Sequence, residues 1–214
     1  MVFSIEVALQ RVRQMIKTQG EPVVHHYRET PFTVLISCLL SLRTQDKTTD
    51  AASARLFKLA KTPSSMRQLS VEDIEKAIYP VGFYRTKARQ ISEISQQLEE
   101  KYAGHVPNIM EELLALPGVG RKTANLVRTL GHDLPGICVD IHVHRILNRW
   151  GYVQTKTPDE TEMRLRDLLP KRYWKPLNGW IVSFGQKICQ PVSPFCSRCS
   201  LLDICLRLSV KHSR

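Results

Sequence analysis

Apolar side chains recur with a helical period along most of this chain. Between Ile5 and Ile16 they are spaced four, three and four residues apart, which predicts an amphipathic helix. A longer stripe of the same period runs from Tyr84 to Tyr102, and another runs from Trp174 to Ile188. No segment alternates apolar and polar residues with period two, and no hairpin dipeptide separates two β-branched runs. We therefore expect an all-α fold.

Local signals for helix ends agree with this periodicity. The residues from Thr157 to Glu160 read as a capping box with proline at the first helical position, and Ser70 followed by Asp73 marks another helix start. Gly20 and Gly151 fall where helices should stop. No linker, repeat or low-complexity stretch is visible, so the sequence allows either one core or two lobes with a tight junction.

A glycine-rich turn separates two short helical stretches in the middle of the chain. Residues 116–124 read Leu-Pro-Gly-Val-Gly-Arg-Lys-Thr-Ala, and Asn108 is placed to cap the first helix. Pro117 should end that helix, while the glycines permit backbone angles closed to other residues and let a ligand approach the chain. Amides of the turn and of the next helix then point outward, which predicts a phosphate site in a helix-hairpin-helix. A purely structural hairpin is the alternative.

Two ionisable residues accompany the hairpin. Lys122 lies in the first turn of the second helix, where the helix dipole and Arg121 should disfavour its ammonium form. A nucleophilic lysine needs a free amine, although a solvated lysine that touches phosphate is the plainer interpretation. Asp140, in Val-Asp-Ile-His, can cap the next helix. A carboxylate facing a lysine across a cleft would also stabilise a cationic sugar under attack by an amine.

Four of the six cysteines lie close together late in the chain. They form a Cys-x6-Cys-x2-Cys-x5-Cys run made of Cys189, Cys196, Cys199 and Cys205. Four thiolates can surround one centre, and the spacing is compatible with either an iron-sulfur cluster or structural zinc. Disulfides are disfavoured, because six cysteines in 214 residues without a signal peptide do not describe a secreted scaffold. Cys38 and Cys138 lie in apolar runs and are expected to be buried hydrophobes.

Composition adds a strong positive charge to this picture. The formal net charge of +11 and the pI near 9.6 favour an anionic partner, nucleic acid first, although such an excess can also serve solubility alone. No apolar run approaches the ~20 residues needed to cross a bilayer. With no export signal visible, we expect an intracellular protein, in the cytoplasm or nucleoid of a prokaryote.

Three elements occur together in this order: the glycine-rich turn, the Val-Asp-x-His sequence at residues 139–142 and the cysteine run. In combination they resemble the endonuclease III family of helix-hairpin-helix base-excision DNA glycosylases, over essentially the whole chain. The resemblance implies two helical lobes flanking a DNA-binding cleft. One is a helical barrel at 22–134 with the helix-hairpin-helix at 109–131; the other, at 1–21 plus 135–214, holds a 4Fe-4S cluster on the four cysteines.

The same resemblance implies a reaction. Lys122 would attack C1′ of a flipped, damaged nucleotide, expel the base and form a Schiff base whose β-elimination nicks the strand, while Asp140 would assist the departing base. The enzyme would be a monomeric, bifunctional glycosylase and abasic-site lyase for oxidised pyrimidines in double-stranded DNA, with no membrane partner. Arg43 and Phe83 would fill the space of the flipped base. The expected hairpin contacts to DNA are Gly118, Val119, Gly120 and Arg121.

The chain departs from the family pattern in two places. A glutamine is usual where Arg43 stands, which leaves the lesion and opposite-base preference open. Family members often carry several basic residues between the first two cysteine ligands, whereas residues 190–195 carry none, so this loop should bind phosphate more weakly. The basic residues that could substitute for them are Arg121, Lys171, Arg172 and Lys175.

Two other functions share parts of this pattern. A monofunctional glycosylase for mismatched thymine, uracil or adenine would have the same fold, but such enzymes generally lack a lysine at the position of Lys122. A non-catalytic DNA-binding module with a zinc-stapled tail would keep the hairpin and the cysteines. The presence of both Lys122 and Asp140 argues against that module.

Overall fold

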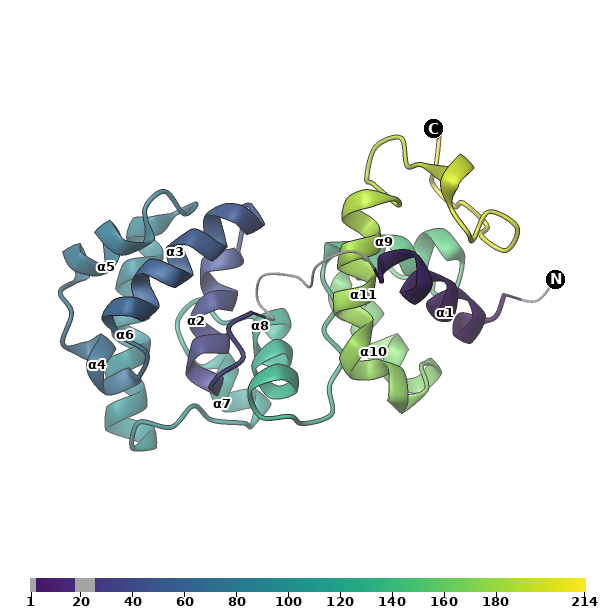
Figure 1. Cartoon of the computed structure of the whole chain (residues 1–214). Helices are drawn as coiled ribbons and strands as arrows, with labels where there is room; N and C mark the ends of the chain where they lie inside the picture. The colour runs from purple at the N-terminus through teal and green to yellow at the C-terminus, as the bar shows by residue number, and fades with distance from the viewer. Residues whose placement is uncertain (1–2, 18–25) are drawn as a thin grey trace. The chain divides into compact units, whose positions relative to one another are not determined.

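The computed structural model describes residues 3–17 and 26–214, and within these ranges all regular secondary structure is helical (Figure 1). The all-α prediction is therefore confirmed. The chain divides into two compact units: residues 1–22 and 137–214 form unit 1, and residues 23–136 form unit 2. The predicted helix stop at Gly20 and the predicted lobe boundary after residue 21 lie outside the described residues.

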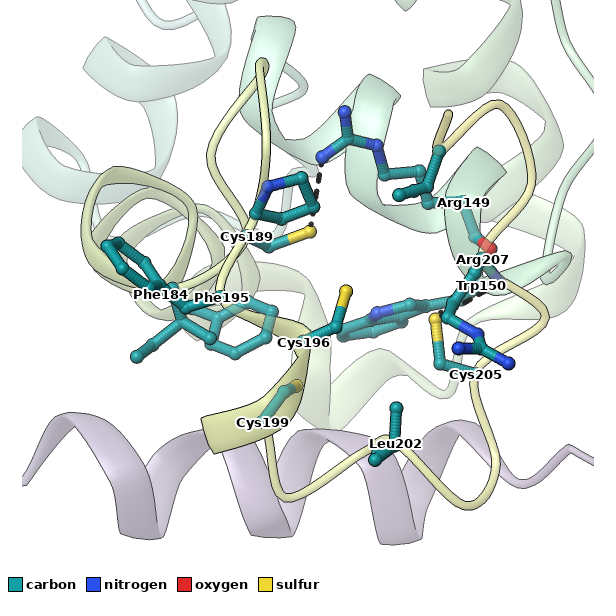
Figure 2. Close-up of a pocket in the computed structure, with 13 residues that line it drawn as sticks. Arg149, Trp150, Phe184, Cys189, Phe195, Cys196, Cys199, Leu202, Cys205 and Arg207 are labelled. Carbon is teal, nitrogen blue, oxygen red and sulfur yellow. Dashed lines mark hydrogen bonds between the residues drawn. The ribbon is translucent and has the colours of Figure 1, made fainter. Parts of the chain in front are cut away.

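Unit 1 combines the two ends of the chain around one apolar core. Its helices are α1 (Ile5–Ile16), α9 (Ile141–Trp150), α10 (Pro158–Leu168), the 3₁₀ turn η3 (Lys171–Tyr173), α11 (Trp174–Lys187) and the 3₁₀ turn η4 (Cys196–Arg198). The apolar stripe of α1 is buried as predicted, and α1 packs against α11 (Figure 1). In the same core the rings of Trp150 and Phe184 lie 6.2 Å apart, next to the cysteine segment (Figure 2).

A polar contact fastens α1 to the cysteine segment. Arg11 Nη1 donates to the carbonyl of Ser200 at 2.8 Å and forms an ion pair with Asp203 at 2.6 Å. Both Arg11 and Asp203 are partly exposed, so the pair itself contributes little stability. Its effect is to fix where the segment lies on α1.

Unit 2 is built around one enclosed helix, α2 (Pro31–Ser41). The other helices of the unit are α3 (Asp46–Leu59), α4 (Pro63–Arg67), α5 (Val71–Ile78), α6 (Tyr84–Tyr102), α7 (Met110–Leu114), α8 (Arg121–Leu126) and the π-helical turn η2 (Val127–Gly131). Every α2 residue from Phe32 to Leu40 is buried, because α3, α6, α8 and η2 all pack against it. A helix that is apolar all round has to be enclosed in this way.

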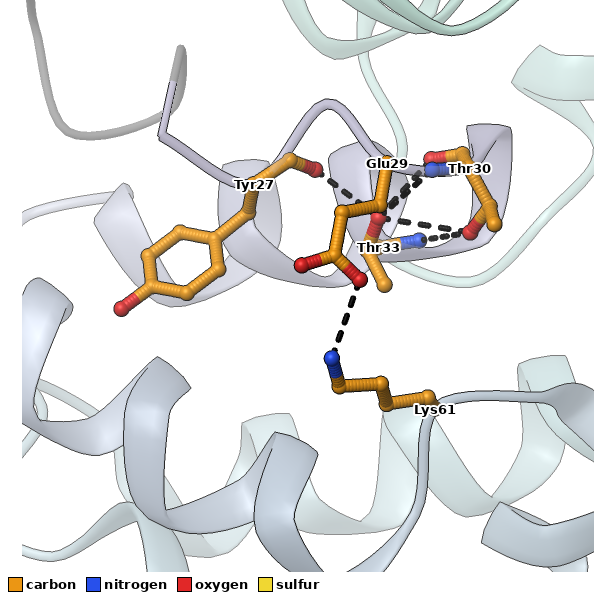
Figure 3. A network of polar contacts seen from close by, with 5 residues as sticks. All are labelled: Tyr27, Glu29, Thr30, Thr33 and Lys61. Carbon is orange, nitrogen blue, oxygen red and sulfur yellow. Dashed lines mark hydrogen bonds and ion pairs between the residues drawn. The ribbon is translucent and has the colours of Figure 1, made fainter.

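The first turn of α2 is fixed by reciprocal hydrogen bonds. Thr30 Oγ1 accepts the N–H of Thr33 at 3.1 Å, and Thr33 Oγ1 accepts the N–H of Thr30 at the same distance, which forms a capping box (Figure 3). Thr33 Oγ1 also lies 2.8 Å from the carbonyl of Tyr27, to which it donates. Glu29 forms an ion pair with Lys61 at 3.0 Å, so the segment before α2 is tied to the residues after α3.

The predicted helix starts at Ser70 and Thr157 are confirmed. Ser70 Oγ accepts the N–H of Asp73 at 3.1 Å, and Thr157 Oγ1 accepts the N–H of Glu160 at 3.1 Å. The capping box at Thr157 is only half formed, however. The Glu160 carboxylate accepts the N–H of Lys156 at 2.8 Å, one residue before the position that the motif predicts.

The hairpin region differs from the prediction in two details. Ile109 occupies the cap position of α7 and provides no side-chain cap, so the predicted cap at Asn108 is wrong. The second helix changes from α to π geometry at Val127, which shifts the register of its buried face. Leu130 continues the spacing of the buried residues Ala124 and Val127 but is only half-buried, while Leu126 is buried.

Candidate functional site

The two glycines of the hairpin turn serve different purposes. Gly118 has a φ of +73°, a conformation that residues with a side chain rarely adopt. Gly120 has a φ of −100°, and a side chain built there would meet nothing within 4 Å. Gly118 therefore makes the turn possible, while Gly120 leaves the surface open beside the start of α8. Between them Val119 points inward, and its N–H donates to the carbonyl of Leu116 at 3.2 Å.

Lys122 is the second residue of α8 and is half-buried. It follows Arg121 directly, in the turn whose amides have no acceptors within the helix. Because α8 packs against α2, Lys122 lies near Cys38 on that helix. Burial raises the pKa of the Cys38 thiol to about 12, and the positive charge of Lys122 acts in the opposite direction. Cys38 and Cys138 are both buried, as the sequence predicted.

Asp140 belongs to unit 1 and caps α9, which confirms the predicted helix start. Its Oδ1 accepts the N–H groups of His142 and Val143 at 2.9 and 3.0 Å. Its Oδ2 lies 3.2 Å from Nδ1 of His142, and the carboxylate is almost fully buried. The sequence did not indicate His142 as a partner of the Asp140 carboxylate, because residues two apart on a helix do not face each other. The cap residue is extended, which turns its carboxylate back over the first turn.

Arg43 and Phe83 come from two different turns of unit 2 and lie together. Arg43 is in the turn between α2 and α3, and Phe83 is the residue before α6. The Arg43 guanidinium lies 5.6 Å from the centre of the Phe83 ring. Both side chains are exposed, and both residues have a positive φ, 52° and 59° respectively. The structure thus brings these two predicted DNA contacts into one exposed pair.

All four cysteines of the terminal run line one cavity of unit 1 (Figure 2). The cavity walls are mainly apolar and include Trp150, Phe195 and Leu202. Burial raises the pKa of the Cys199 thiol to about 11 and also raises the pKa of Cys189 and Cys205. Within residues 3–17 and 26–214, no group of three or more His, Cys, Asp or Glu side chains forms a site for a metal ion.

Arg149 was not singled out in the sequence, but it organises this cavity. It is buried in the last turn of α9, and its Nη1 lies 3.5 Å from Sγ of Cys189, to which it donates. Its guanidinium also donates to the carbonyls of Gln190 and Pro191, both at 2.6 Å. A basic residue at a helix C-terminus usually interacts with the carbonyls of its own helix. Here the guanidinium instead binds carbonyls of the cysteine segment, about forty residues further along the chain. The sequence around Arg149 could not indicate this contact.

The cysteine loop gains positive charge from outside residues 190–195. Arg198 and Arg214 both stack on the Phe195 ring, with their guanidinium carbons 4.2 and 3.9 Å from its centre. Arg214 is held there because it donates to the carbonyl of Ser193 at 3.0 Å and to the side chain of Gln190 at 2.8 Å. The lack of basic residues noted in the loop is thus partly offset by Arg214, which is distant in sequence.

The whole chain is similar to proteins of DNA repair. Residues 36–171 match the family model described as "HhH-GPD superfamily base excision DNA repair protein". Endonuclease III of Thermotoga maritima is 50% identical over 181 residues, which is 85% of each chain. No helix of the described ranges has the length and apolar character of a membrane span.

Two solved structures have the same architecture as this chain over 96% of both chains. A non-covalent endonuclease III–DNA complex has a TM-score of 0.86 and 35% sequence identity. A trapped covalent intermediate of endonuclease III with DNA has a TM-score of 0.85, also at 35% identity. The family match spans most of the chain and the curated relative agrees with it. The chain therefore belongs to the endonuclease III family, within the helix-hairpin-helix superfamily of base excision DNA repair proteins.

Proposed function

We propose that this chain excises oxidised pyrimidines from double-stranded DNA and then nicks the strand by β-elimination, with Lys122 as the nucleophile. Members of this family are DNA glycosylases and abasic-site lyases. The observation that carries the proposal is the position of Lys122, the second residue of α8, directly after the glycine turn. A turn that binds a phosphate would place the neighbouring deoxyribose within reach of that amine.

The chemistry assigned to Lys122 has two stages. Its amine forms a bond to C1′ while the bond from C1′ to the base breaks, and the departing base takes up a proton. Opening of the sugar then gives a protonated Schiff base, loss of a C2′ proton follows, and the 3′ phosphate leaves. The first stage removes the base and the second cuts the strand. A single lysine thus accounts for both activities.

Asp140 is proposed to stabilise the positive charge that develops on the sugar as the base leaves. A carboxylate supplies this stabilisation best when it is fixed in place before the reaction. Two backbone N–H groups and the ring of His142 hold the Asp140 carboxylate from three directions. His142 is therefore assigned as a positioning residue for Asp140.

DNA contacts are proposed for the hairpin and for the pair of Arg43 and Phe83. Gly118 and Gly120 are exposed and would let a phosphate approach the backbone, with Arg121 adding positive charge. Val119 would contribute by anchoring the turn. Arg43 and Phe83, which are exposed and stacked on each other, would enter the stack when the damaged nucleotide swings out. Contacts of the hairpin to phosphate carry no sequence information, so lesion choice must come from elsewhere.

A 4Fe-4S cluster is proposed for the cavity lined by Cys189, Cys196, Cys199 and Cys205. The residues fit the group: four thiols share one apolar cavity, and Arg149 donates to Sγ of Cys189. With four protein thiolates the cluster would have no open position, so it would stabilise the loop and leave base removal to Lys122. Arg198 and Arg214 would then lie on an ordered loop that can face phosphate.

Purified protein is expected to be brown and to contain iron and acid-labile sulfide, because the thiols of the cavity exchange their protons for iron. Cys199→Ser should lose the colour and most of the iron, and it should melt at a lower temperature. The measurements are metal analysis, the visible absorption spectrum and thermal unfolding. Cys38→Ser, at a buried thiol of unit 2, is the matched control and should keep the iron. Colourless protein with one zinc per chain would rule out the cluster.

The lesion class is tested by an incision assay on matched duplexes. Each duplex holds thymine glycol, dihydrouracil, uracil, a mismatched thymine or an abasic site. We expect cleavage at thymine glycol, which is an oxidised pyrimidine, at dihydrouracil, which shares its saturated C5–C6 bond, and at the abasic site, with little removal of uracil or mismatched thymine. The product should carry the sugar remnant of β-elimination. Removal of uracil or thymine without strand cleavage would instead identify a monofunctional mismatch glycosylase.

A further inference from the structure

A buried lysine links the two turns that carry Arg43 and Phe83. Lys87 lies in the first turn of α6 and is only 5% exposed. Its Nζ donates to the carbonyls of Leu40 and Leu42 at 3.0 and 2.5 Å and to Oγ1 of Thr44 at 3.3 Å. Three oxygen acceptors match the three N–H donors of an ammonium group. The charge therefore sits at the end of α2, where the last carbonyls of a helix favour a cation.

The same polar network reaches the turn before α6. Thr44 Oγ1, which accepts from Lys87, also accepts the N–H of Gly82 at 3.2 Å. A side chain at Gly82 would come within 2.6 Å of the carbonyl oxygen of Arg43, so the two turns lie backbone against backbone. Lys87 is thus one of the contacts that hold the Arg43 turn against the Phe83 turn.

Arg43 and Phe83 need such support because both adopt left-handed backbone angles. A residue with a side chain is strained in this region and stays there only when its surroundings over-determine its conformation. The surroundings here are the polar contacts of Lys87 and Thr44 and the close packing at Gly82. Without the ammonium group, the carbonyls of Leu40 and Leu42 would lose a donor and the Arg43 turn could relax.

We infer that Lys87 is a positioning residue for gap filling: it holds Arg43 and Phe83 in the geometry in which the pair can enter the DNA stack. The inference rests on the proposed function, since it needs these two residues to occupy the space of a flipped nucleotide. Burial lowers the pKa of Lys87 to about 8, which reflects the cost of keeping a charge in this place. The three oxygen acceptors offset that cost.

The test compares two substrates that differ in their need for gap filling. Excision of thymine glycol from a duplex requires an unstacked site to be filled, whereas an abasic site in a single strand offers its sugar to Lys122 without any partner strand. Lys87→Met is expected to lower the rate of excision from the duplex by about 10- to 100-fold. A displacement of Arg43 and Phe83 by about 1 Å is enough to slow the reaction by this factor. Borohydride trapping on the single-stranded abasic DNA should change less than about twofold, because that reaction does not need Arg43 and Phe83 to be held in place.

Several variants separate positioning from a general loss of stability. Lys101→Met, at an exposed lysine at the other end of α6, is the matched control and should act as wild type on both substrates. Lys87→Arg, which keeps charge and donors, should recover part of the duplex rate. Thr44→Val removes the shared hydroxyl with little change in shape, and it should reproduce the selective duplex defect even where Lys87→Met folds poorly.

A double-mutant comparison completes the test. If Lys87 acts through the gap-filling pair, adding Lys87→Met to Phe83→Ala should cost much less than it costs in the wild type. An equal loss on both substrates, or an unchanged duplex rate, would overturn the inference. Failure of the proposed function has a different signature, because the wild type itself would then trap neither the duplex nor the single strand.

Discussion

Replacing Lys122 by alanine is expected to abolish both strand cleavage and borohydride trapping on abasic DNA. The lysine supplies the nitrogen atom that becomes bonded to the sugar, and alanine has no nucleophilic group to replace it. Loss of an essential nucleophile lowers enzymatic rates by on the order of 10⁴-fold or more. Single-turnover incision measures strand cleavage, and gel analysis of the borohydride-trapped complex measures formation of the bond to the sugar.

The control for this variant is Lys122→Arg, which retains the positive charge but offers no comparable nucleophile. Both variants should fold as the wild type does, because the side chain is half-buried and alanine and arginine are good helix formers. Binding to a duplex with a stable abasic-site analogue should persist in both. Trapping by Lys122→Ala at the wild-type rate would show that another amine is the nucleophile.

Asparagine at position 140 should separate the two roles of Asp140. Asparagine caps helices about as well as aspartate, so Asp140→Asn is expected to change the free energy of unfolding by only a few tenths of a kcal/mol. It removes the negative charge, however, and base excision should slow by about 10²- to 10⁴-fold. Thermal unfolding and single-turnover excision of thymine glycol measure the two quantities.

Alanine at the same position provides the contrast. Asp140→Ala loses the cap as well as the charge, so it should lower the free energy of unfolding by about 1 kcal/mol in addition to slowing excision. Trapping on preformed abasic sites should suffer less than base excision in both variants, because the base has already left those substrates. If the Asp140→Asn variant excised thymine glycol at the wild-type rate, the Asp140 carboxylate would serve only as a helix cap.

Periodicity predicted the long helices well because the spacing of apolar side chains along a helix is a local property of the sequence. The stripe between Ile5 and Ile16 matches α1, and the stripe from Tyr84 to Tyr102 matches α6 at both ends. The cap at Asp140 was also predictable, since a cap bonds to amides two and three residues away. Features that depend on residues close together in sequence are therefore the ones that the amino-acid order predicts best, although the expected cap at Asn108 was wrong.

The contacts that escaped prediction connect residues far apart in the chain. Lys87 reaches carbonyls more than forty residues away, and Arg149 bonds to the cysteine segment at a similar separation. In the sequence each is an ordinary lysine or arginine on a helix, and only the fold reveals its acceptors. The π turn that begins at Val127 likewise depends on packing against α2 and leaves no mark on the hydrophobic period.

Because α1 packs against α11, the ribosome finishes making unit 2 before it makes the helix against which α1 packs. Unit 2 is continuous in sequence and can fold as soon as residue 136 has emerged, whereas the twelve-residue α1 has to wait for a partner made from residue 174 onward. At ~5–20 residues per second this delay lasts tens of seconds at the slower rates. During that time the apolar stripe of α1 stays exposed to solvent, because a helix of this length is not stable in isolation.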